Sequence, residues 1–511
     1  MKTLQLYDEP SRELLGRFIF PVRSGKVRMT DRRFLEREIR TWLNSPERML
    51  QITGEQYYEN EHDILLRKRT VIGENGTLTE VENLPNNRLI DNQYAKMVDQ
   101  KANYLCGKPV TFDTKSDAYG KALARFFGKK QQRAIKRLAE NAIIGGKAWL
   151  FPCYAHDGKL TFVLFRAYEI LPFWADTEHT ELDCAVHFFP IWEYDENEEA
   201  HITFKVEVMH GGGIDPFIWK DEKLIPDTDA PSGAYLTAFD NNGNTVPLNW
   251  DRMPLICFKY NNREIPLIKR VKCLQDALNV LISDFANGME EDVHHTILVL
   301  KNYDGENLGT FRRNLATYGA VKVRTVDGAD GGVDKLTIEV NAENYKVIEK
   351  ALKDAIIENA RGYDAKTDKL GASPNEMNIQ SMYSDIDLDA DGMETEFQAA
   401  FEELLWFVNV YLKNAGEGDF MNEEVDVIFN RDVLINETEA IANCGKSQGI
   451  ISRETIVKQH PWVDDPEEEL ARIAAEAEAE AQQNDAYRMA FENQRSQNQN
   501  VPAAGDGAMN E

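Results

Sequence analysis

Residues 341–415 contain two long helical patterns separated by a polar break, and this feature constrains the fold more than any other. The first pattern covers residues 341–363. Its apolar residues recur every three or four positions, as on one face of an α-helix: Tyr345, Ile348, Leu352, Ala355 and Ile356. The break covers residues 364–382 and contains Gly371 and Pro374, which favour turns over helix. The stretch is therefore expected to form a helical hairpin.

The second pattern covers residues 383–415 and becomes apolar on nearly every side toward its end. Its apolar residues are Met393, Phe397, Phe401, Leu404, Trp406, Phe407, Val408, Val410, Tyr411 and Leu412. A helix that is apolar all round is buried, which here means between domains or between subunits. At about 1.5 Å of rise per residue, a helix from Tyr383 to Lys413 would span roughly 46 Å.

Another helix is expected within residues 261–291, because Pro266 suits a first helical position. Its apolar residues alternate at spacings of four and three, which is typical of closely packed helices: Leu267, Val271, Leu274, Leu278, Leu281 and Phe285. Residues 292–340 follow with three strand patterns and one short helix. One helix therefore leads out to a small α/β module and the helix at 341–363 leads back, so the module lies at the tip of a stalk.

The whole chain is predicted to be an α+β protein. Residues 1–260 begin with helical patterns, including one over residues 86–105, and continue with short strands over residues 148–258. Residues 416–480 contain short capped helices. Residues 481–511, rich in Asn, Gln, Gly and Ala, are expected to form a disordered tail.

Composition limits the possible functions. With 511 residues, 42% of them apolar, the chain can bury the cores of two to four domains. Its net charge of −28 argues against tight nonspecific DNA binding, because that affinity comes largely from Lys and Arg at phosphates, although it permits passing contact. The six cysteines have no metal-binding spacing and are expected to be reduced core residues. No apolar signal segment and no run near the roughly 18 residues of a membrane span occurs, so a soluble, intracellular protein is expected.

Residues 125–147 reverse the acidic balance, with seven basic residues against the single acid Glu140. The basic residues are Arg125, Lys129, Lys130, Arg133, Lys136, Arg137 and Lys147. A solvated helix face, or a patch that meets the acidic surface of another subunit, is the simpler interpretation of such a run. Contact with DNA phosphates is the functional alternative, and both remain open.

Short patterns that imitate enzyme motifs lack the required context. Ser447 lies in a Gly-x-Ser-x-Gly pattern at the end of a helix rather than at a strand-to-helix turn, and His210 begins a His-Gly-Gly-Gly run. The Gly-Gly-Lys run at 145–147 is followed by Ala148, and no phosphate-binding loop sequence occurs. The chain is not expected to be an enzyme. A hydrolase using Ser447 is the enzymatic alternative, and its activity would be lost on Ser447→Ala.

Asp387, Asp389 and Asp391, followed by Gly392, imitate the start of a calcium-binding loop. Gln398 stands where such a loop requires a bidentate Glu. We expect instead a cluster of acids at a helix N-terminus, which the helix dipole favours. No metal and no cofactor is expected.

Three blocks of sequence resemble the portal proteins of long-tailed double-stranded DNA phages and their prophages. The blocks are YYENEHDILLRKR (residues 57–69), NNRLIDNQYAKMVDQKANYLCGKPVTF (residues 86–112) and GIISRETIVKQHPWVDDPEEELARI (residues 449–473). The stalk helices and the small module lie between the second and third blocks, and the resemblance covers residues 20–480.

The resemblance implies a mainly helical portal fold assembled as a dodecameric ring at one capsid vertex. Its regions would be the wing (1–260), two stem helices (261–291 and 341–363), the clip (292–340), the tunnel loop (364–382), the long wing helix (383–415) and the crown (416–480).

The ring would be the channel for DNA packaging and ejection, with double-stranded DNA passing through it. Its implied partners are the terminase, head-completion or adaptor proteins that connect head and tail, and the major capsid or scaffolding protein. It would lie in the virion after assembly in the bacterial host cytoplasm, with no membrane. A mostly acidic wall would let DNA slide without gripping it. A structural ring or connector component of the virion without a DNA gating role is the alternative.

On the basis of this resemblance we hypothesise two sets of site residues. The tunnel loop would present Lys366, Lys369, Asn375, Asn378 and Gln380 to the DNA. Docking of terminase and adaptor on the clip would use Arg312, Arg313, Lys322 and Arg324. Many relatives end the loop with Ser-Gly and an Ala-Leu-Lys type sequence, where this chain has SPNEMNIQSMY (residues 373–383).

Overall fold

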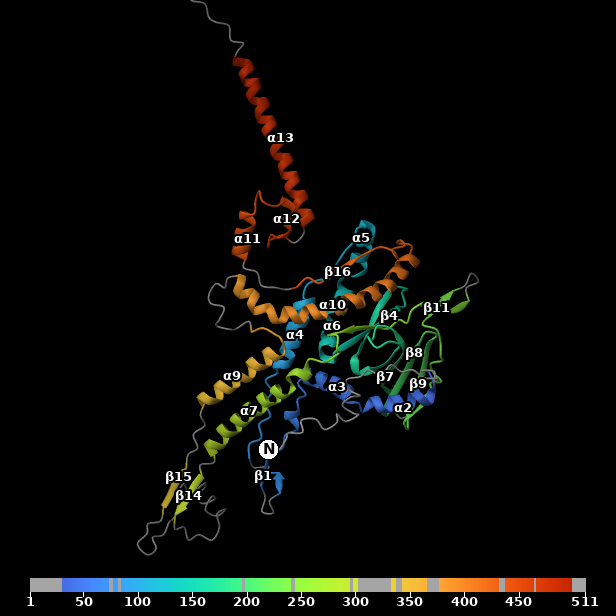
Figure 1. The fold of residues 1–511 in the computed structure, drawn as a ribbon, viewed down its shortest axis with the longest axis vertical. Coiled ribbons are helices and arrows are strands. Elements are labelled where there is room, and N and C mark those ends of the chain that lie inside the picture. The colour runs from blue at the N-terminus through green and yellow to red at the C-terminus, as the bar shows by residue number, and fades with distance from the viewer. Residues whose placement is uncertain are drawn as a thin grey trace, which may run out of the picture. The chain divides into compact units, whose positions relative to one another are not determined.

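The computed structural model describes residues 30–72, 77–80, 84–194, 198–239, 244–294, 297–301, 332–336, 342–364, 376–431, 437–463 and 466–498. The chain divides into two units, one formed by residues 1–364 and 384–432 and the other by residues 365–383 and 433–511. Helices and sheets are mixed, which confirms the α+β prediction (Figure 1). None of the described helices is long and apolar enough to cross a membrane.

Helices occur in both units. In chain order they are α2 (Arg32–Leu43), α3 (Pro46–Tyr58), α4 (Gln93–Cys106), α5 (Asp117–Phe126), α6 (Lys129–Gly145), α7 (Ile268–His294), α9 (Ala342–Asn359), α10 (Glu376–Asn414), α11 (Glu437–Lys446), α12 (Arg453–Lys458) and α13 (Pro466–Asn498). Two short 3₁₀-helices are η1 (Asp63–Leu66) and η2 (Ala167–Glu169).

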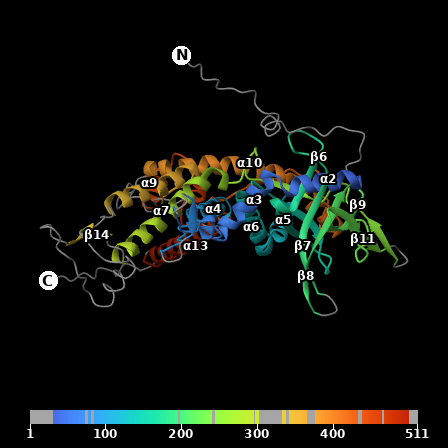
Figure 2. The ribbon, with the colours of Figure 1, turned by 90° about the horizontal axis from the view of Figure 1, so that it is seen from below.

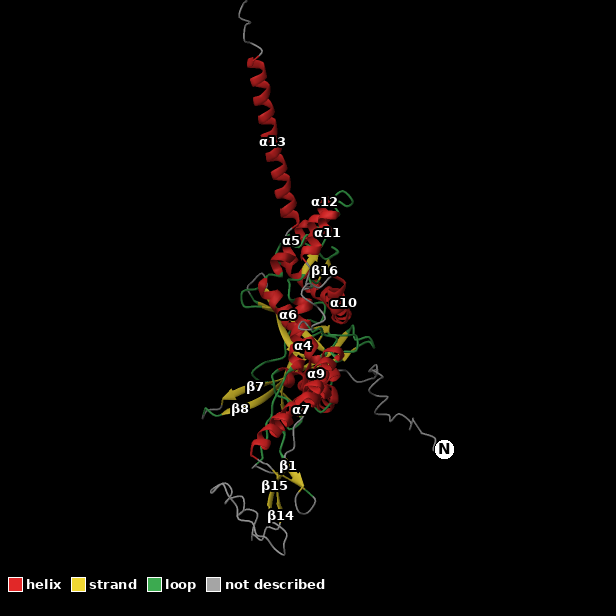
Figure 3. Cartoon of the chain, turned by 90° about the vertical axis from the view of Figure 1, so that its left-hand side faces the viewer, coloured by secondary structure: helices red, strands yellow, loops and turns green. Residues whose placement is uncertain are grey.

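The strands pair in antiparallel sheets (Figure 3). The largest sheet has the order β10-β9-β8-β7-β6, with β6 (Ile170–Trp174), β7 (Leu182–Tyr194), β8 (Ala200–His210), β9 (Gly213–Lys220) and β10 (Lys223–Pro226). A second sheet has the order β13-β4-β5, with β4 (Lys147–Tyr154), β5 (Leu160–Arg166) and β13 (Ile256–Lys259). The β-rich stretch at 148–258 is therefore present as predicted.

The other strands form pairs. They are β1 (Thr70–Ile72) with β2 (Leu78–Glu80), β11 (Leu236–Phe239) with β12 (Thr245–Leu248), β14 (Ile297–Lys301) with β15 (Gly332–Leu336), and β3 (Thr111–Asp113) with β16 (Asp426–Ile428). The β14–β15 pair lies in the small module expected at 292–340, and the middle strand predicted there falls outside the described residues.

The largest sheet is covered by α2, whose apolar face follows from residues spaced four apart. Leu35 and Ile39 are buried against Phe173, Val186 and Val206 of the sheet. Asp31 caps the helix by accepting a hydrogen bond from the Phe34 amide (3.1 Å). This packing fixes α2 to the largest sheet.

Helices α7 and α9, which the sequence predicts to lead to and from residues 292–340, lie side by side (Figure 2), and we call this helix pair the stalk. The rings of Phe285 and Tyr345 stack between them with centroids 3.9 Å apart. The predicted apolar seam of α7 is only partly buried, however, because Leu274, Leu281 and Phe285 keep intermediate exposure.

Helix α10 begins at Glu376, earlier than predicted. Residues 376–382 were expected to belong to the polar loop, but good helix formers follow immediately after Pro374, and proline is tolerated just ahead of a helix. In unit 1, Phe397 and Phe401 of α10 pack edge-on against Phe258 of β13, at centroid distances of 5.1 and 5.6 Å. The predicted burial of its last third is confirmed, since residues 404–412 are buried or half-buried.

In the second unit, α13 continues to Asn498, through residues 481–498 where the sequence predicts disorder. The reason is local, since this stretch contains several Ala, Gln and Arg residues, which favour helix, and the first proline beyond it is Pro502.

The cysteines are free, as predicted. Cys106 and Cys184 are buried, whereas Cys273 is exposed, so the prediction that all six are core residues is wrong for Cys273.

Candidate functional site

One deeply buried stripe of α7 is polar. Gln275, Asn279, Ser283 and Asn287 are spaced four residues apart, and each is at most 1% exposed. Residues at this spacing lie above one another on a helix, so their side chains form one stripe along it. Buried polar groups require hydrogen-bond partners, so the segment that packs against this stripe must supply donors or acceptors.

The partners are backbone amides of an extended segment, residues 86–94. Ser283 Oγ accepts from the Leu89 amide (2.9 Å), Asn279 Oδ1 from the Asp91 amide (3.2 Å), and Gln275 Oε1 from the Gln93 amide (3.0 Å). Asn287 Oδ1 accepts from the Asn87 amide at 2.7 Å. We call these four contacts the polar ladder.

The ladder forms because two repeats nearly coincide. Four residues of helix rise about 6 Å, and two residues of extended chain advance about 6.6 Å. Every second amide of the segment therefore meets every fourth side chain of α7. The prediction of a helix over residues 86–105 is wrong for residues 86–92, because these amides bond to α7 and the helix begins only at Gln93, capped by Asn92.

The block YYENEHDILLRKR docks on the same helix. His62 Nδ1 accepts a hydrogen bond from Asn279 Nδ2 (2.8 Å), so its proton lies on Nε2, which donates to the Tyr57 carbonyl (3.1 Å). Burial lowers the pKa of His62 and favours this neutral form. Beside it, Lys272 of α7 pairs with Asp63 at 2.6 Å. Two of the three blocks that carry the resemblance therefore converge on α7.

The stalk, α4 and α10 meet within unit 1 at the buried carboxylate of Asp389. Lys101 of α4 contacts it at 2.8 Å and Arg270 of α7 at 3.2 Å, and the Tyr260 hydroxyl donates to it. Burial alone would raise the pKa of Asp389, but the Lys101 ammonium and the donated hydrogen bonds hold it below its usual value. The Lys101 ammonium also donates to the Arg361 carbonyl at the end of α9 (3.0 Å). Asp389 therefore ties three helices together as an ion.

The neighbouring acids of α10 are held by one guanidinium. Arg431 contacts Asp387 (3.1 Å) and Glu394 (2.7 Å), and it also pairs with Asp391. Because α10 begins at Glu376, these acids lie within the helix, and the prediction that they cluster at its N-terminus is wrong. Their spacing of four and three places them on one face, which a single Arg fork can span.

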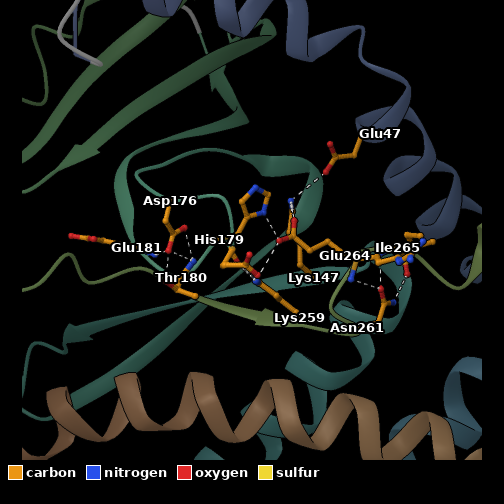
Figure 4. A network of polar contacts seen from close by, with 12 residues as sticks. Glu47, Lys147, Asp176, His179, Thr180, Glu181, Lys259, Asn261, Glu264 and Ile265 are labelled. Atoms are coloured by element: carbon orange, nitrogen blue, oxygen red, sulfur yellow. Dashed lines mark hydrogen bonds and ion pairs between the residues drawn. The ribbon is translucent and has the colours of Figure 1, made fainter. Parts of the chain in front are cut away.

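Lys147, the last residue of the basic run, is buried in a separate polar network (Figure 4). Its ammonium lies 2.6 Å from Glu264, whose other oxygen contacts His179 Nδ1 at 2.6 Å. Burial opposes ionisation of Glu264, but Lys147 and His179 together hold its pKa well below the usual range. An exposed Glu47 adds a second, longer contact to Lys147 (3.2 Å). Lys147 is therefore a structural cation.

The other basic residues of 125–147 remain on the surface of unit 1. Arg125 pairs with Glu417 (3.1 Å), and Lys136 donates to Asn103 (2.6 Å). Lys129, Arg133 and Arg137 are exposed. That these residues meet another subunit or contact DNA stays a prediction.

The imitated enzyme motifs have ordinary structural roles. The Ser447 hydroxyl donates to the Asn443 carbonyl one turn earlier in α11 (2.8 Å). His210 ends β8 at the turn into β9, and its Nδ1 accepts from the Gly212 amide (3.0 Å). Within the described ranges, no group of three His, Cys, Asp or Glu residues could hold a metal ion.

The predicted site residues fall largely outside the described residues. This holds for Lys366, Lys369 and Asn375 of the tunnel loop, and for the clip residues Arg312, Arg313, Lys322 and Arg324. Asn378 and Gln380 belong to the first turns of α10. Sequence reasoning also missed the polar ladder, whose signal was the run of Gln, Asn, Ser and Asn at every fourth residue of a predicted helix.

The polar ladder and the buried ion pairs hold helices in place. Comparison with known proteins shows that the chain belongs to the class of phage portal proteins. Residues 48–483 match the model of the family described as "Phage portal protein, SPP1 Gp6-like", so the chain belongs to this family, which is structural and not enzymatic. The portal protein of Bacillus phage SPP1 is 28% identical over 438 residues, covering 85% of this chain and 84% of that protein. The portal protein of Clostridium phage phiCD119 is 26% identical over 429 residues, covering 82% and 90%.

Proposed function

We propose that this chain forms a ring at one vertex of a phage capsid, through which DNA is packaged and ejected. The observation that carries the proposal is the family match over residues 48–483. In this proposal residues 1–260 form the wing, α7 and α9 the stem, 292–340 the clip, and 416–480 the crown. The terminase and the head–tail connector proteins dock on the ring, which is a component of the virion.

The polar ladder and the contacts of Asp389 support this role. A stem that surrounds moving DNA must keep its position relative to the wing. The polar ladder and the Asp389 contacts connect α7 to residues 86–94, α4 and α10 through directional bonds. Hydrogen bonds fix register and orientation in a way that apolar contact alone does not.

Electron microscopy of the purified full-length protein tests the ring. We expect closed rings with a central hole wide enough for duplex DNA, and dodecamers when assembly occurs with the capsid or scaffolding protein. Monomers both alone and in assembled capsids would refute the proposal.

DNA contact in the channel is assigned to Lys366 and Lys369 of the loop before α10. Two lysines in a protein with a net charge of −28 give weak, salt-screened contacts with phosphates. The variant Lys366→Ala/Lys369→Ala is expected to change the packaging rate or the length of packaged DNA, with rings still forming. Lys458→Ala/Lys446→Ala serves as the matched control. Unchanged packaging by the first variant would favour a ring component without a DNA gating role.

Docking of terminase and adaptor is assigned to the clip residues Arg312, Arg313, Lys322 and Arg324. Reversal of these four charges to Glu should weaken binding of both partners to assembled rings in a pull-down. Retained binding of both partners would exclude this docking site.

A further inference from the structure

The hairpin of β7 and β8 extends beyond the rest of the largest sheet. β6 pairs with β7 as far as His187, and β9 pairs with β8 from Phe204 onward. β7 and β8 continue to pair with each other as far as Tyr194 and Ala200. We call residues 190–194 and 200–204 the outer hairpin. A two-stranded ribbon is marginally stable by itself, so the outer hairpin is expected to gain from further contacts.

One face of the outer hairpin is apolar and exposed. Side chains alternate between the two faces of a strand, and this face is formed by three cross-strand pairs: Pro190 with Phe204, Trp192 with Ile202, and Tyr194 with Ala200. It continues the sheet face that α2 covers at Phe188 and Val206. Trp192, Tyr194 and Ile202 are 65%, 73% and 52% exposed. Contiguous apolar surface of this kind marks an interaction site.

The partner of this face is expected to be rich in arginine. A groove of about 320 Å³ adjoins the face, and its apolar lining comes from Ile52, Phe188, Pro190 and Phe204. Four glutamates line the same groove against the single cation Arg48: Glu55, Glu59, Glu61 and Glu169. Residues 193–200 add five acids and no Lys or Arg. Arginine suits such a surface, because its stem covers apolar groups while its guanidinium stacks on aromatic rings and binds carboxylates.

The outward face of α2 provides such arginines. Three exposed residues lie there at spacings of four and three, on the side opposite the buried residues of the helix: Arg33, Arg37 and Arg40. Arg33 forms no ion pair with a described residue, while Arg37 pairs with Glu38 (3.2 Å) and Arg40 with Glu222 (2.8 Å) at the surface. Surface pairs contribute little stability, so contacts with another chain can replace them at small cost.

The outer hairpin and α2 lie on opposite sides of unit 1 (Figure 2). A head-to-tail contact that closes into a ring requires two different surfaces of each subunit. We propose that the outer hairpin of each copy binds the face of α2 that carries Arg33, Arg37 and Arg40 on the next copy. This inference rests on the ring proposed above and names one pair of surfaces that would join its subunits. Trp, Tyr and Arg are also the residues that most often dominate the binding energy of protein interfaces.

Thiol cross-linking of the full-length protein tests this pairing. Thr41→Cys/Ala200→Cys, in a background that carries Cys273→Ser to remove an exposed thiol, places one cysteine at each surface and keeps the aromatic and arginine residues. Within one chain the two thiols are far apart. The ring of Phe188 contacts that of Trp42, next to Thr41, whereas Ala200 pairs with Tyr194, about 20 Å further along β7.

A short bismaleimide should therefore join thiols of different chains. Because each chain supplies both thiols, we expect a ladder of dimers, trimers and larger species on denaturing gels. Either single variant should give no species beyond a dimer. Mass photometry of the same samples before cross-linking reports ring formation independently.

Charge reversal separates specific docking from chance contact. Adding Arg33→Glu/Arg37→Glu should reduce the ladder about fivefold or more, since it places acids opposite the acidic groove. Lys446→Glu/Lys458→Glu makes the same charge change in the second unit and should leave the ladder near its original yield. Rings without a ladder, or equal effects of the two charge reversals, would overturn this inference and leave the proposed ring in place. Absence of both rings and ladder would overturn both proposals.

Discussion

Asn279 makes one contact of the polar ladder and two further hydrogen bonds, so its side chain serves three partners. It accepts from the Asp91 amide and from Gln275 Nε2, and it donates to His62. It is completely buried, so water cannot replace these bonds.

We predict that Asn279→Ala lowers the free energy of unfolding by about 3 kcal/mol, since each buried group left without a partner costs about 1–3 kcal/mol. Denaturant unfolding of the two proteins measures the difference. Asn359→Ala, which removes an exposed amide from the end of α9, should change stability by less than about 0.5 kcal/mol. Equal effects of the two substitutions would show that the ladder adds no stability.

Glu264 makes the stability of unit 1 depend on pH, and the direction of this dependence follows from its pKa. Its pKa in the folded protein lies below the ordinary value of about 4.3, so the unfolded chain binds more protons there. Its contribution to stability is therefore complete above about pH 4.3 and is lost as the pH falls toward the folded pKa.

Glu264→Gln leaves the buried Lys147 ammonium with only the exposed Glu47 as a partner, and we expect a loss of about 3–5 kcal/mol at pH 7. The variant should also lose stability less steeply than the original protein below about pH 4.3. Glu47→Gln is the matched control, expected to cost at most about 1 kcal/mol. Urea unfolding at several pH values checks both statements, and parallel pH profiles would contradict the second.

At the scale of elements, two stretches of α10 are held by different contacts. Phe397 and Phe401 pack on β13, while Arg431 binds three acids on another part of the helix. Arg431 also lies at the end of the chain segment that leaves unit 1. It therefore anchors β16 and the residues after it to α10.

We predict that Arg431→Lys speeds hydrogen exchange of residues 426–431 about tenfold, because one ammonium cannot replace a fork that contacts several carboxylates. Tenfold corresponds to about 1.4 kcal/mol, within the range for hydrogen bonds to charged groups. Arg472→Lys, at an exposed pair with Glu468, should leave exchange in its own helix unchanged. Unaltered exchange at 426–431 would show that Arg431 is not the anchor.

The sequence predicted the elements that depend on apolar periodicity. The stalk, the burial of residues 404–412 and the β-rich stretch all follow from where Leu, Phe and Trp recur. The polar ladder and the start of α4 were missed for a physical reason. Periodicity counts apolar residues, whereas residues 86–92 stay extended and Gln275 is buried because side chains of α7 bond to backbone amides that are distant in sequence. Such partners become visible only in the folded chain.

At the scale of the molecule, the stalk has an apolar surface that unit 1 does not cover. Val280 and Met289 of α7 are 41% and 51% exposed, and Val347 and Ile348 of α9 are 68% and 50% exposed. If the chain forms the proposed ring, we expect these side chains to pack on the stalk of the neighbouring subunit.

We predict that Val347→Asp/Ile348→Asp abolishes ring formation, because it would bury two unpaired charges at each subunit contact. Thermal unfolding of the monomer should change little, since both side chains are exposed within one chain. Mass photometry measures the oligomer, with Met489→Asp on α13, also exposed, as the control. Rings formed by the double variant would place the subunit contact elsewhere.

The polar ladder also restricts how α7 could slide. Moving the helix by four residues, about 6 Å, would bring Asn279, Ser283 and Asn287 opposite the amides that now bond to Gln275, Asn279 and Ser283, so three of four rungs would form again. A shift of one or two residues would leave every rung without a partner. The ladder therefore defines the register of α7 against residues 86–94 in steps of four residues, and it disfavours intermediate registers by four buried amides at once.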